Sequence, residues 1–250
     1  MKLLSLKLFL VSLSITVLLL GPVQAAHHGG GEMSFKERLN KTGKKPNTVR
    51  VPTDANREEV HALIKEHKPE MLYLDAHHAP CTEWDVSRIV KAAQELDTPV
   101  MMRIDHADQA GLISSILDLG VFSIKVPTVE DEETVQKIID GFYYPPLGKR
   151  SLGGANNYGE RDKNGKKMAT IDGMSYPEWW NKNAILGCKL ETLKGVLNAR
   201  FLAMPGVDYF DFGGQDLQHD LNIQKHPGFE KLADCREFVI NALEGTGTRF

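Results

Sequence analysis

The sequence of 250 residues predicts an α/β fold of the (β/α)8 TIM-barrel type, with about six clear β/α units. Two observations predict this fold. Short apolar runs alternate with segments whose apolar residues recur at helical spacing, which indicates a parallel sheet covered by helices. Most of the runs begin roughly 20 to 30 residues apart, a spacing that is typical of the units of a β/α barrel.

Each predicted strand is a short apolar run bounded by turn or polar residues. In chain order these runs are residues 47–51, 71–74, 99–104, 121–126, 184–190 and 207–212. The second run leads directly into Asp75, and Pro127 closes the fourth. The strand ends are therefore well marked in the sequence.

Each predicted helix carries an apolar stripe at helical spacing. In chain order these segments are residues 34–39, 56–66, 82–96, 112–117, 135–139, 193–201 and 229–243. Thr82 and Asp85 have the spacing of a capping box, with an aspartate in place of the usual glutamate. Residues 143–183 break the alternation, and a connection of that length in a compact domain is usually functional or mobile.

Composition bounds the class of protein. The chain is 42% hydrophobic and 25% charged, which fits one barrel-sized domain or two small ones and does not fit a disordered chain. The formal net charge of −3 gives no electrostatic support for nucleic-acid binding. We therefore expect no nucleic-acid partner.

The N-terminus predicts export. Lys2 and Lys7 precede an apolar run at residues 8–20, and small residues follow up to Ala26, the pattern of a cleaved signal peptide over residues 1–26. A transmembrane anchor is the alternative, but the run is shorter than the roughly 20 residues that a membrane span requires. We expect a periplasmic or secreted protein with no stable membrane anchor after cleavage.

The mature chain then divides simply. Residues 27–33 are glycine- and histidine-rich and predict a flexible linker, and residues 34–250 predict the folded domain. The three cysteines, Cys81, Cys188 and Cys235, form neither a disulfide framework nor a Cys-x-x-Cys metal site. Cys188 is interpreted as a core residue, whereas a nucleophilic thiol at Cys81 stays open as an alternative.

Polar residues gather where the predicted strands end. The carboxyl ends of barrel strands converge on one face, so residues distant in sequence can share a site there. The candidates in chain order are Asp75, His77, His78, Arg103, Glu191 and Asp216. Two carboxylates suit a hard divalent cation, an arginine suits a carboxylate or an oxyanion, and a histidine suits proton transfer.

Each candidate also has a structural interpretation. Glu191 is alternatively the start of a helix, and Asp216 is alternatively an N-cap after two glycines. His77 and His78 are adjacent, so in strand geometry they point to opposite sides. We therefore expect one histidine to be structural and assign that role to His77.

Four segments resemble the motifs of one family. Residues 74–80 (Leu-Asp-Ala-His-His-Ala-Pro) resemble the Asp-Gly-Glu-His-Ala-Pro signature of the HpcH/HpaI aldolase/citrate lyase family, the class II pyruvate aldolases. Residues 144–153 resemble its Tyr-Pro-Pro-x-Gly-x-Arg-Gly-x-Gly loop, residues 189–192 its Val-Glu-x metal strand, and residues 212–217 its Ile-Gly-Pro-x-Asp-Leu turn. The resemblance runs from about residue 34 to the end of the sequence.

The resemblance implies a β/α barrel, assembled into hexamers, that makes or breaks carbon–carbon bonds of 2-oxo acids through a metal-bound pyruvate enolate. His78 then falls on the catalytic base, Asp75 on its supporting acid and Arg103 on the arginine that binds the keto oxygen. Two metal ligands are implied, Glu191 and Asp216, for Mg²⁺, Mn²⁺ or Co²⁺. The implied carboxylate-binding turn consists of Gly213, Gly214, Gln215 and Asp216. Asp118 falls on an acid near a neighbouring subunit's site.

The sequence departs from the family pattern in several places. His77 replaces the signature glutamate, Gly214 and Gln215 replace a Pro-Ala-like pair, and Ser151 replaces a loop glycine. Residues 160–183 look longer than usual and suggest a lid or an assembly contact. The last two β/α units are missing from the pattern, so we expect a barrel that is shortened at its C-terminus.

Two functions are therefore considered. The first is a divalent-metal-dependent aldolase that cleaves a 4-hydroxy-2-oxo acid to pyruvate and an aldehyde. The alternative is an exported, non-catalytic protein that binds a 2-oxo acid or dicarboxylate on the same scaffold.

Overall fold

The computed structural model describes residues 33–250 except residues 155 and 163. The predicted signal peptide, and the linker up to residue 32, lie outside the described residues. Six parallel strands form one sheet in the order β1-β2-β3-β4-β5-β6. They are β1 (Thr48–Val51), β2 (Met71–Asp75), β3 (Val100–Arg103), β4 (Ser123–Val126), β5 (Ile185–Leu190) and β6 (Tyr209–Phe212). All six predicted strands are confirmed.

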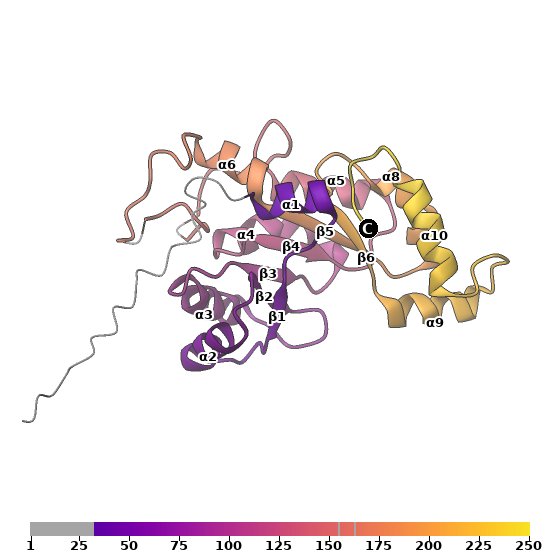
Figure 1. Cartoon of the computed structure of the whole chain (residues 1–250), viewed down its shortest axis with the longest axis horizontal. Coiled ribbons are helices and arrows are strands. Elements are labelled where there is room, and N and C mark those ends of the chain that lie inside the picture. The colour runs from indigo at the N-terminus through magenta and orange to yellow at the C-terminus, as the bar shows by residue number, and fades with distance from the viewer. Residues whose placement is uncertain (1–32, 155, 163) are drawn as a thin grey trace, which may run out of the picture.

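Helices follow the strands and cover the sheet (Figure 1). The first group is α1 (Phe35–Thr42), α2 (Arg57–His67), α3 (Glu83–Gln94), the 3₁₀ helix η1 (Ala107–Leu112), α4 (Ile113–Asp118) and α5 (Glu132–Phe142). The second group is α6 (Tyr176–Asn183), α7 (Leu193–Leu197), α8 (Ala199–Leu202), α9 (Gly214–Gln224) and α10 (Leu232–Ala242). Among residues 33–154, 156–162 and 164–250, every helix is too short or too polar to span a bilayer.

The sheet curls into a half-barrel. Lys45, just before β1, makes an ion pair with Asp211 of β6, so the two edge strands approach each other across the sheet (Figure 1). At the far edge, the backbone of Arg249 forms an isolated parallel bridge with Tyr209 of β6. The six-unit α/β barrel type is confirmed, as a half-barrel of six parallel strands.

Successive side chains along the strands point alternately to a hydrophobic core and to the concave face of the half-barrel. Leu72, Leu74 and Ile124 are fully buried in a hydrophobic core that strands and helices share. Lys125 and Asp211 instead form an ion pair with Nζ and Oδ2 2.7 Å apart, although they belong to β4 and β6. The concave face of the half-barrel is therefore polar and charged.

Local signals place the ends of several helices. Thr82 is the N-cap of α3, and it exchanges side-chain and backbone hydrogen bonds with Asp85, so the predicted capping box is confirmed. The helix predicted over residues 193–201 is instead two short helices, because the chain reaches φ −86° and ψ 0° at Asn198 between them. The α-helices α6 and α9 and the 3₁₀ helix η1 were not predicted.

The segment that interrupts the alternation is built into the fold. Within residues 160–183, α6 ends directly before β5, and the indole of Trp180 donates a hydrogen bond to the carbonyl of Phe142. Tyr176 and Trp179 stack with ring centroids 6.0 Å apart and are both buried. Because α6 lies where β5 begins, it belongs to the end of the sheet opposite the carboxyl ends, so α6 is not a lid over them.

Candidate active site

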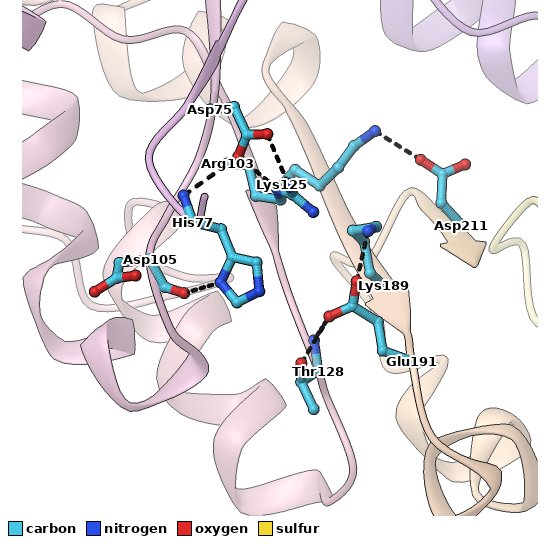
Figure 2. Close-up of polar contacts among 9 residues, drawn as sticks. All are labelled: Asp75, His77, Arg103, Asp105, Lys125, Thr128, Lys189, Glu191 and Asp211. Carbon is cyan, nitrogen blue, oxygen red and sulfur yellow. Dashed lines mark hydrogen bonds and ion pairs between the residues drawn. The ribbon is translucent and has the colours of Figure 1, made fainter. Parts of the chain in front are cut away.

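A buried ion pair joins the ends of β2 and β3. Asp75 and Arg103 are register partners, and Nε and Nη2 of Arg103 donate to the two carboxylate oxygens at 2.7 and 2.6 Å (Figure 2). Such a two-pronged contact fixes both side chains. Burial would raise the pKa of Asp75, but hydrogen bonds from Arg103 and the charges of Arg103 and Arg50 hold it below its ordinary value. Asp75 is therefore a carboxylate that positions Arg103.

Glu191 follows β5 and is 2% exposed. Its Oε1 accepts a hydrogen bond from Lys189 at 2.5 Å, and its Oε2 accepts from the backbone N–H and the hydroxyl of Thr128 at 3.0 and 2.6 Å. Burial would raise the pKa of Glu191, but these hydrogen bonds and the charges of Lys189 and Arg103 lower it. Figure 2 shows Glu191 near the Asp75–Arg103 pair, at the carboxyl ends of the strands.

The two histidines lie side by side. Their ring centroids are 4.2 Å apart, so the expectation that they point to opposite sides is wrong, because β2 ends at Asp75 and the chain no longer alternates. The backbone N–H of His77 donates to Asp75, and Nδ1 of its ring contacts the carbonyl oxygen of Asp105 (Figure 2). A carbonyl only accepts, so Nδ1 carries the proton. His78 is exposed and packs against this anchored ring.

The glycine turn after β6 fits closely around Glu191. A Cβ on Gly213 would lie 2.1 Å from Oε1 of Glu191, so only glycine leaves room for the carboxylate. Helix α9 begins at Gly214 and has no side-chain cap at its N-terminus. Gln215 and Asp216 are exposed in its first turn, so Asp216 is not an N-cap. Glu191 does not begin a helix either, because Thr192 is the N-cap of α7.

The implied divalent-cation site does not fit these side chains as they lie. Both oxygens of Glu191 already have donors, and the donor on Oε1 is the ammonium group of Lys189. The other implied ligand, Asp216, is exposed and has no hydrogen-bond or ion-pair partner among the described residues. Within the same residues, no group of three or more His, Cys, Asp and Glu side chains could hold a metal ion.

Three charged residues on the concave face were not singled out from the sequence. Lys189 precedes Glu191 by two positions, and a period of two places both side chains on one face of a strand. Lys125 and Asp211 interrupt otherwise apolar strands, and a charge in such a strand is a signal for a polar interior. The spacing of Lys189 and Glu191 and the charges within apolar strands are visible in the sequence. That all of these side chains lie on one face follows only from the order and curl of the strands.

Asp118, the last residue of α4, lies apart from this group. Its carboxylate accepts a hydrogen bond from Nη2 of Arg150 at 2.9 Å. The Arg150 guanidinium also lies over the rings of Tyr144 and Trp180, 4.8 and 4.6 Å from their centroids. The predicted role of Asp118 near a neighbouring subunit stays a prediction.

A cavity of about 470 Å³ opens beside the histidines. His77 and His78 line it together with residues of α3, η1 and α4, among them Val86, Gln109 and Ile116. Cys81 also lines it, but burial raises the pKa of this thiol to about 11. A thiol with so high a pKa is protonated near neutral pH, so the alternative of a nucleophilic Cys81 has no support here.

Comparison with known proteins gives one family. The family model for HpcH/HpaI aldolase/citrate lyase matches residues 53–249. A 2-keto-3-deoxy-L-rhamnonate aldolase of Salmonella gallinarum is 25% identical over 179 residues, and one of Salmonella paratyphi B is 26% identical over 180 residues. Each match covers 71% of this chain and 64% of the relative, so the chain spans less than two thirds of the relatives' length.

Solved structures share the fold. An HpcH/HpaI aldolase from Desulfitobacterium hafniense superposes with a TM-score of 0.64 at 24% identity, covering 86% of this chain and 80% of the other. The citrate synthase SbnG superposes with a TM-score of 0.66 at 22% identity, covering 87% and 80%. At these identities the likeness concerns the fold alone.

Proposed function

Because this chain belongs to the HpcH/HpaI aldolase/citrate lyase family, we propose that it is a carbon–carbon lyase that cleaves a 4-hydroxy-2-oxo acid to pyruvate and an aldehyde. The family contains class II pyruvate aldolases and lyases and is typically dependent on a divalent metal. One observation carries the proposal. The buried Asp75–Arg103 pair and the buried Glu191, which holds Lys189, lie together at the carboxyl ends of the strands (Figure 2).

Arg103 binds the keto oxygen of the substrate. Its Nε and Nη2 are held by Asp75, so Nη1 remains to donate to a ligand. As the carbon–carbon bond breaks, negative charge develops on that oxygen, and a fixed guanidinium stabilises the charge without having to reorganise. The carboxylate of Asp75 is thus a positioning group for Arg103.

The turn after β6 binds the substrate carboxylate. The first backbone N–H groups of a helix have no partners within the helix, and the helix dipole favours an anion beside them. Helix α9 offers these groups at Gly214 and Gln215, with Gly213 as its N-cap and no side-chain cap. The exposed Asp216 lies in the same turn.

His78 moves the proton. It accepts the proton of the 4-hydroxyl group, the C3–C4 bond breaks, and the bonding electron pair passes to the pyruvate enolate while C4 leaves as the aldehyde carbon. His78 then returns its proton to C3 of the enolate, which gives pyruvate. His77, anchored on Asp105 and packed against His78, positions this ring. The cavity beside both histidines gives room for the aldehyde portion of the substrate.

No step is routed through a metal ion. The resemblance implied Mg²⁺, Mn²⁺ or Co²⁺ at Glu191 and Asp216, but the first carboxylate holds Lys189 and the second is exposed. Every step above therefore uses side chains and backbone groups of this chain.

The test is exchange of the methyl protons of pyruvate in D₂O, followed by proton NMR with and without added metal ions. Enolate formation predicts exchange by the native chain and a loss of about 100-fold in Arg103→Lys, because lysine lacks the two-pronged contact with Asp75. The exposed Arg161→Lys is the matched control and keeps the native rate.

Absence of exchange under every condition in a folded sample would exclude the lyase. If calorimetry then showed tight binding of oxalate, the chain would instead be the non-catalytic 2-oxo acid binder that the same residues allow.

Assembly and export are also part of the proposal. A half-barrel leaves strand edges, and proteins normally cover such edges, so we propose a homo-oligomer with the family's hexamer as its expected form.

From residues 1–26 we propose a periplasmic or secreted location. Light scattering of the purified chain measures its mass, and N-terminal sequencing shows whether the mature protein starts after Ala25 or Ala26. A monomer, or a retained Met1, would contradict the respective proposal.

A further inference from the structure

Lys189 and Glu191 form a buried ion pair. Their side chains are 11% and 2% exposed, and Nζ and Oε1 lie 2.5 Å apart. A buried lysine needs a partner, and Glu191 supplies it. The pair is held from both sides, because Thr128 donates two hydrogen bonds to Oε2 and Gly213 leaves no space beyond Oε1.

This ammonium group stands where a divalent cation would bind. A metal ion on Oε1 would lie about 2.1 Å from that oxygen and hence within roughly 5 Å of Nζ. Two cations so close, with a single carboxylate between them, repel each other strongly in a buried site. Lysine and metal therefore exclude each other at Glu191.

Lys189 also has the donors that an oxyanion needs. An ammonium group carries three N–H donors, and among the described residues only Glu191 accepts one of them. Figure 2 shows Arg103 in the same group of polar side chains as Lys189 and Glu191, and Nη1 of Arg103 is outside the pair with Asp75. One ammonium and one guanidinium group can thus approach the same ligand oxygen.

The charge balance of the concave face also favours an anionic ligand. The ion pairs there join five cations to three carboxylates, while Asp216 stays outside them. The cations are Lys45, Arg50, Arg103, Lys125 and Lys189, and the carboxylates are Asp75, Glu191 and Asp211. Pyruvate enolate carries two negative charges, which the excess positive charge matches.

We propose that Lys189 takes the role of the divalent cation, so that its ammonium group and Arg103 together stabilise the enolate oxygen and the reaction needs no metal. This inference rests on the proposed lyase function. Lys189 acts by charge and hydrogen bonding, and no covalent bond to the substrate forms.

The first experiment measures pyruvate methyl exchange in excess chelator and then with about 1 mM Mn²⁺ added. The native chain should exchange at the same rate in both. Lys189→Met should lose about 100-fold in chelator, as expected for removal of an oxyanion donor, and Lys189→Arg should recover most of that loss. The exposed Lys194→Met, on the helix that follows β5, is the control and keeps the native rate.

A second measurement is independent of activity. Titration with Mn²⁺, followed by electron paramagnetic resonance, should show no tight site in the native chain. Lys189→Met should bind Mn²⁺ at least about tenfold more tightly, because removing the ammonium frees Oε1. If that variant does not fold, the chelator result and Lys189→Arg still decide the question.

Three results would overturn the inference. Exchange that stops in chelator and returns with Mn²⁺ would assign the role to the metal and leave the proposed lyase intact. Tight Mn²⁺ binding by the native chain would also assign this role to the metal. A stable mass increase after borohydride treatment with pyruvate would show a covalent imine. Absence of exchange under all conditions is a different outcome, because it removes the lyase function itself.

Discussion

At the scale of single residues, the two adjacent histidines divide one task. His77 is anchored through its backbone to Asp75 and through Nδ1 to the carbonyl of Asp105, whereas His78 is exposed and free to meet a substrate. The sequence suggested that one histidine is structural, but not that its ring supports the other. That relation depends on the bend after β2, which alternation alone does not predict.

Substitution of each histidine tests this division. His78→Gln should lower the rate of pyruvate methyl exchange by about 100-fold, the range for loss of a general base. His77→Gln should lower it by about tenfold, since it acts only through the position of His78. His67→Gln, an exposed residue at the end of α2, serves as the control. The reverse order of the two losses would move the role of base to Nε2 of His77.

Asp75 contributes to the free energy of unfolding through its charge pair with Arg103. Asp75→Asn removes the charge that compensates a buried Arg103, so the free energy of unfolding should fall by about 3 kcal/mol at pH 7. The pKa of Asp75 is lowered by folding, so its contribution is present above the unfolded-state value near 3.9 and is lost as pH falls through the folded-state value.

Urea denaturation at about pH 7 and pH 3 measures both effects. The difference in unfolding free energy between the native chain and Asp75→Asn should shrink at the lower pH. The exposed Asp54→Asn should match the native chain at both. An equal difference at both pH values would show that the Asp75–Arg103 charge pair does not stabilise the fold.

At the scale of elements, strands were predictable and several helices were not. The strands are apolar runs with clear ends, so all six were found. Helix α9 was missed because Gly213 and Gly214 suggested a turn, although Leu217 and Leu221 have helical spacing and are buried. Helix α6 was missed within a polar stretch, although Ser175 and Glu178 form a capping box at its start.

The turn between β6 and α9 makes a prediction of its own. Gly213→Ala would bring a methyl group onto Oε1 of Glu191 and displace this carboxylate, so pyruvate methyl exchange should fall at least about tenfold while the circular dichroism spectrum stays native. Gly111→Ala is the matched control, because a Cβ there meets nothing within 4 Å. Native activity in Gly213→Ala would mean that the position of Glu191 is not required.

At the scale of the whole molecule, α1 closes the end of the half-barrel opposite the site. Nζ of Lys36 contacts Asp208 at 3.1 Å, the hydroxyl of Tyr143 at 2.9 Å and the carbonyl of Ala184 at 3.2 Å. These residues come from distant parts of the chain. The sequence predicted a helix over residues 34–39, but the partners of Lys36 could not be inferred because they depend on the curl of the sheet.

Removal of this contact should be costly. Burial already raises the pKa of Asp208 above its ordinary value, and Lys36→Met would leave that carboxyl without its cation. We expect a loss of about 3 kcal/mol in unfolding free energy, measured by urea denaturation, with no change in the metal dependence of exchange. Lys41→Met, exposed in the last turn of α1, should change stability by less than about 0.5 kcal/mol. Equal losses in both variants would contradict the closing role of Lys36.

The charged concave face brings together side chains that appear in the sequence only as isolated charges in apolar strands. We propose that Arg103, Lys189 and Glu191 on this face form one site for a 2-oxo acid. The most direct measurement is a crystal structure of the mature chain with oxalate, a mimic of pyruvate enolate. We predict oxalate oxygens within about 3.2 Å of the Arg103 guanidinium and the Lys189 ammonium, with Glu191 still bound to Lys189. Oxalate bound through a metal ion on Glu191 and Asp216, or bound away from the strand ends, would contradict this site.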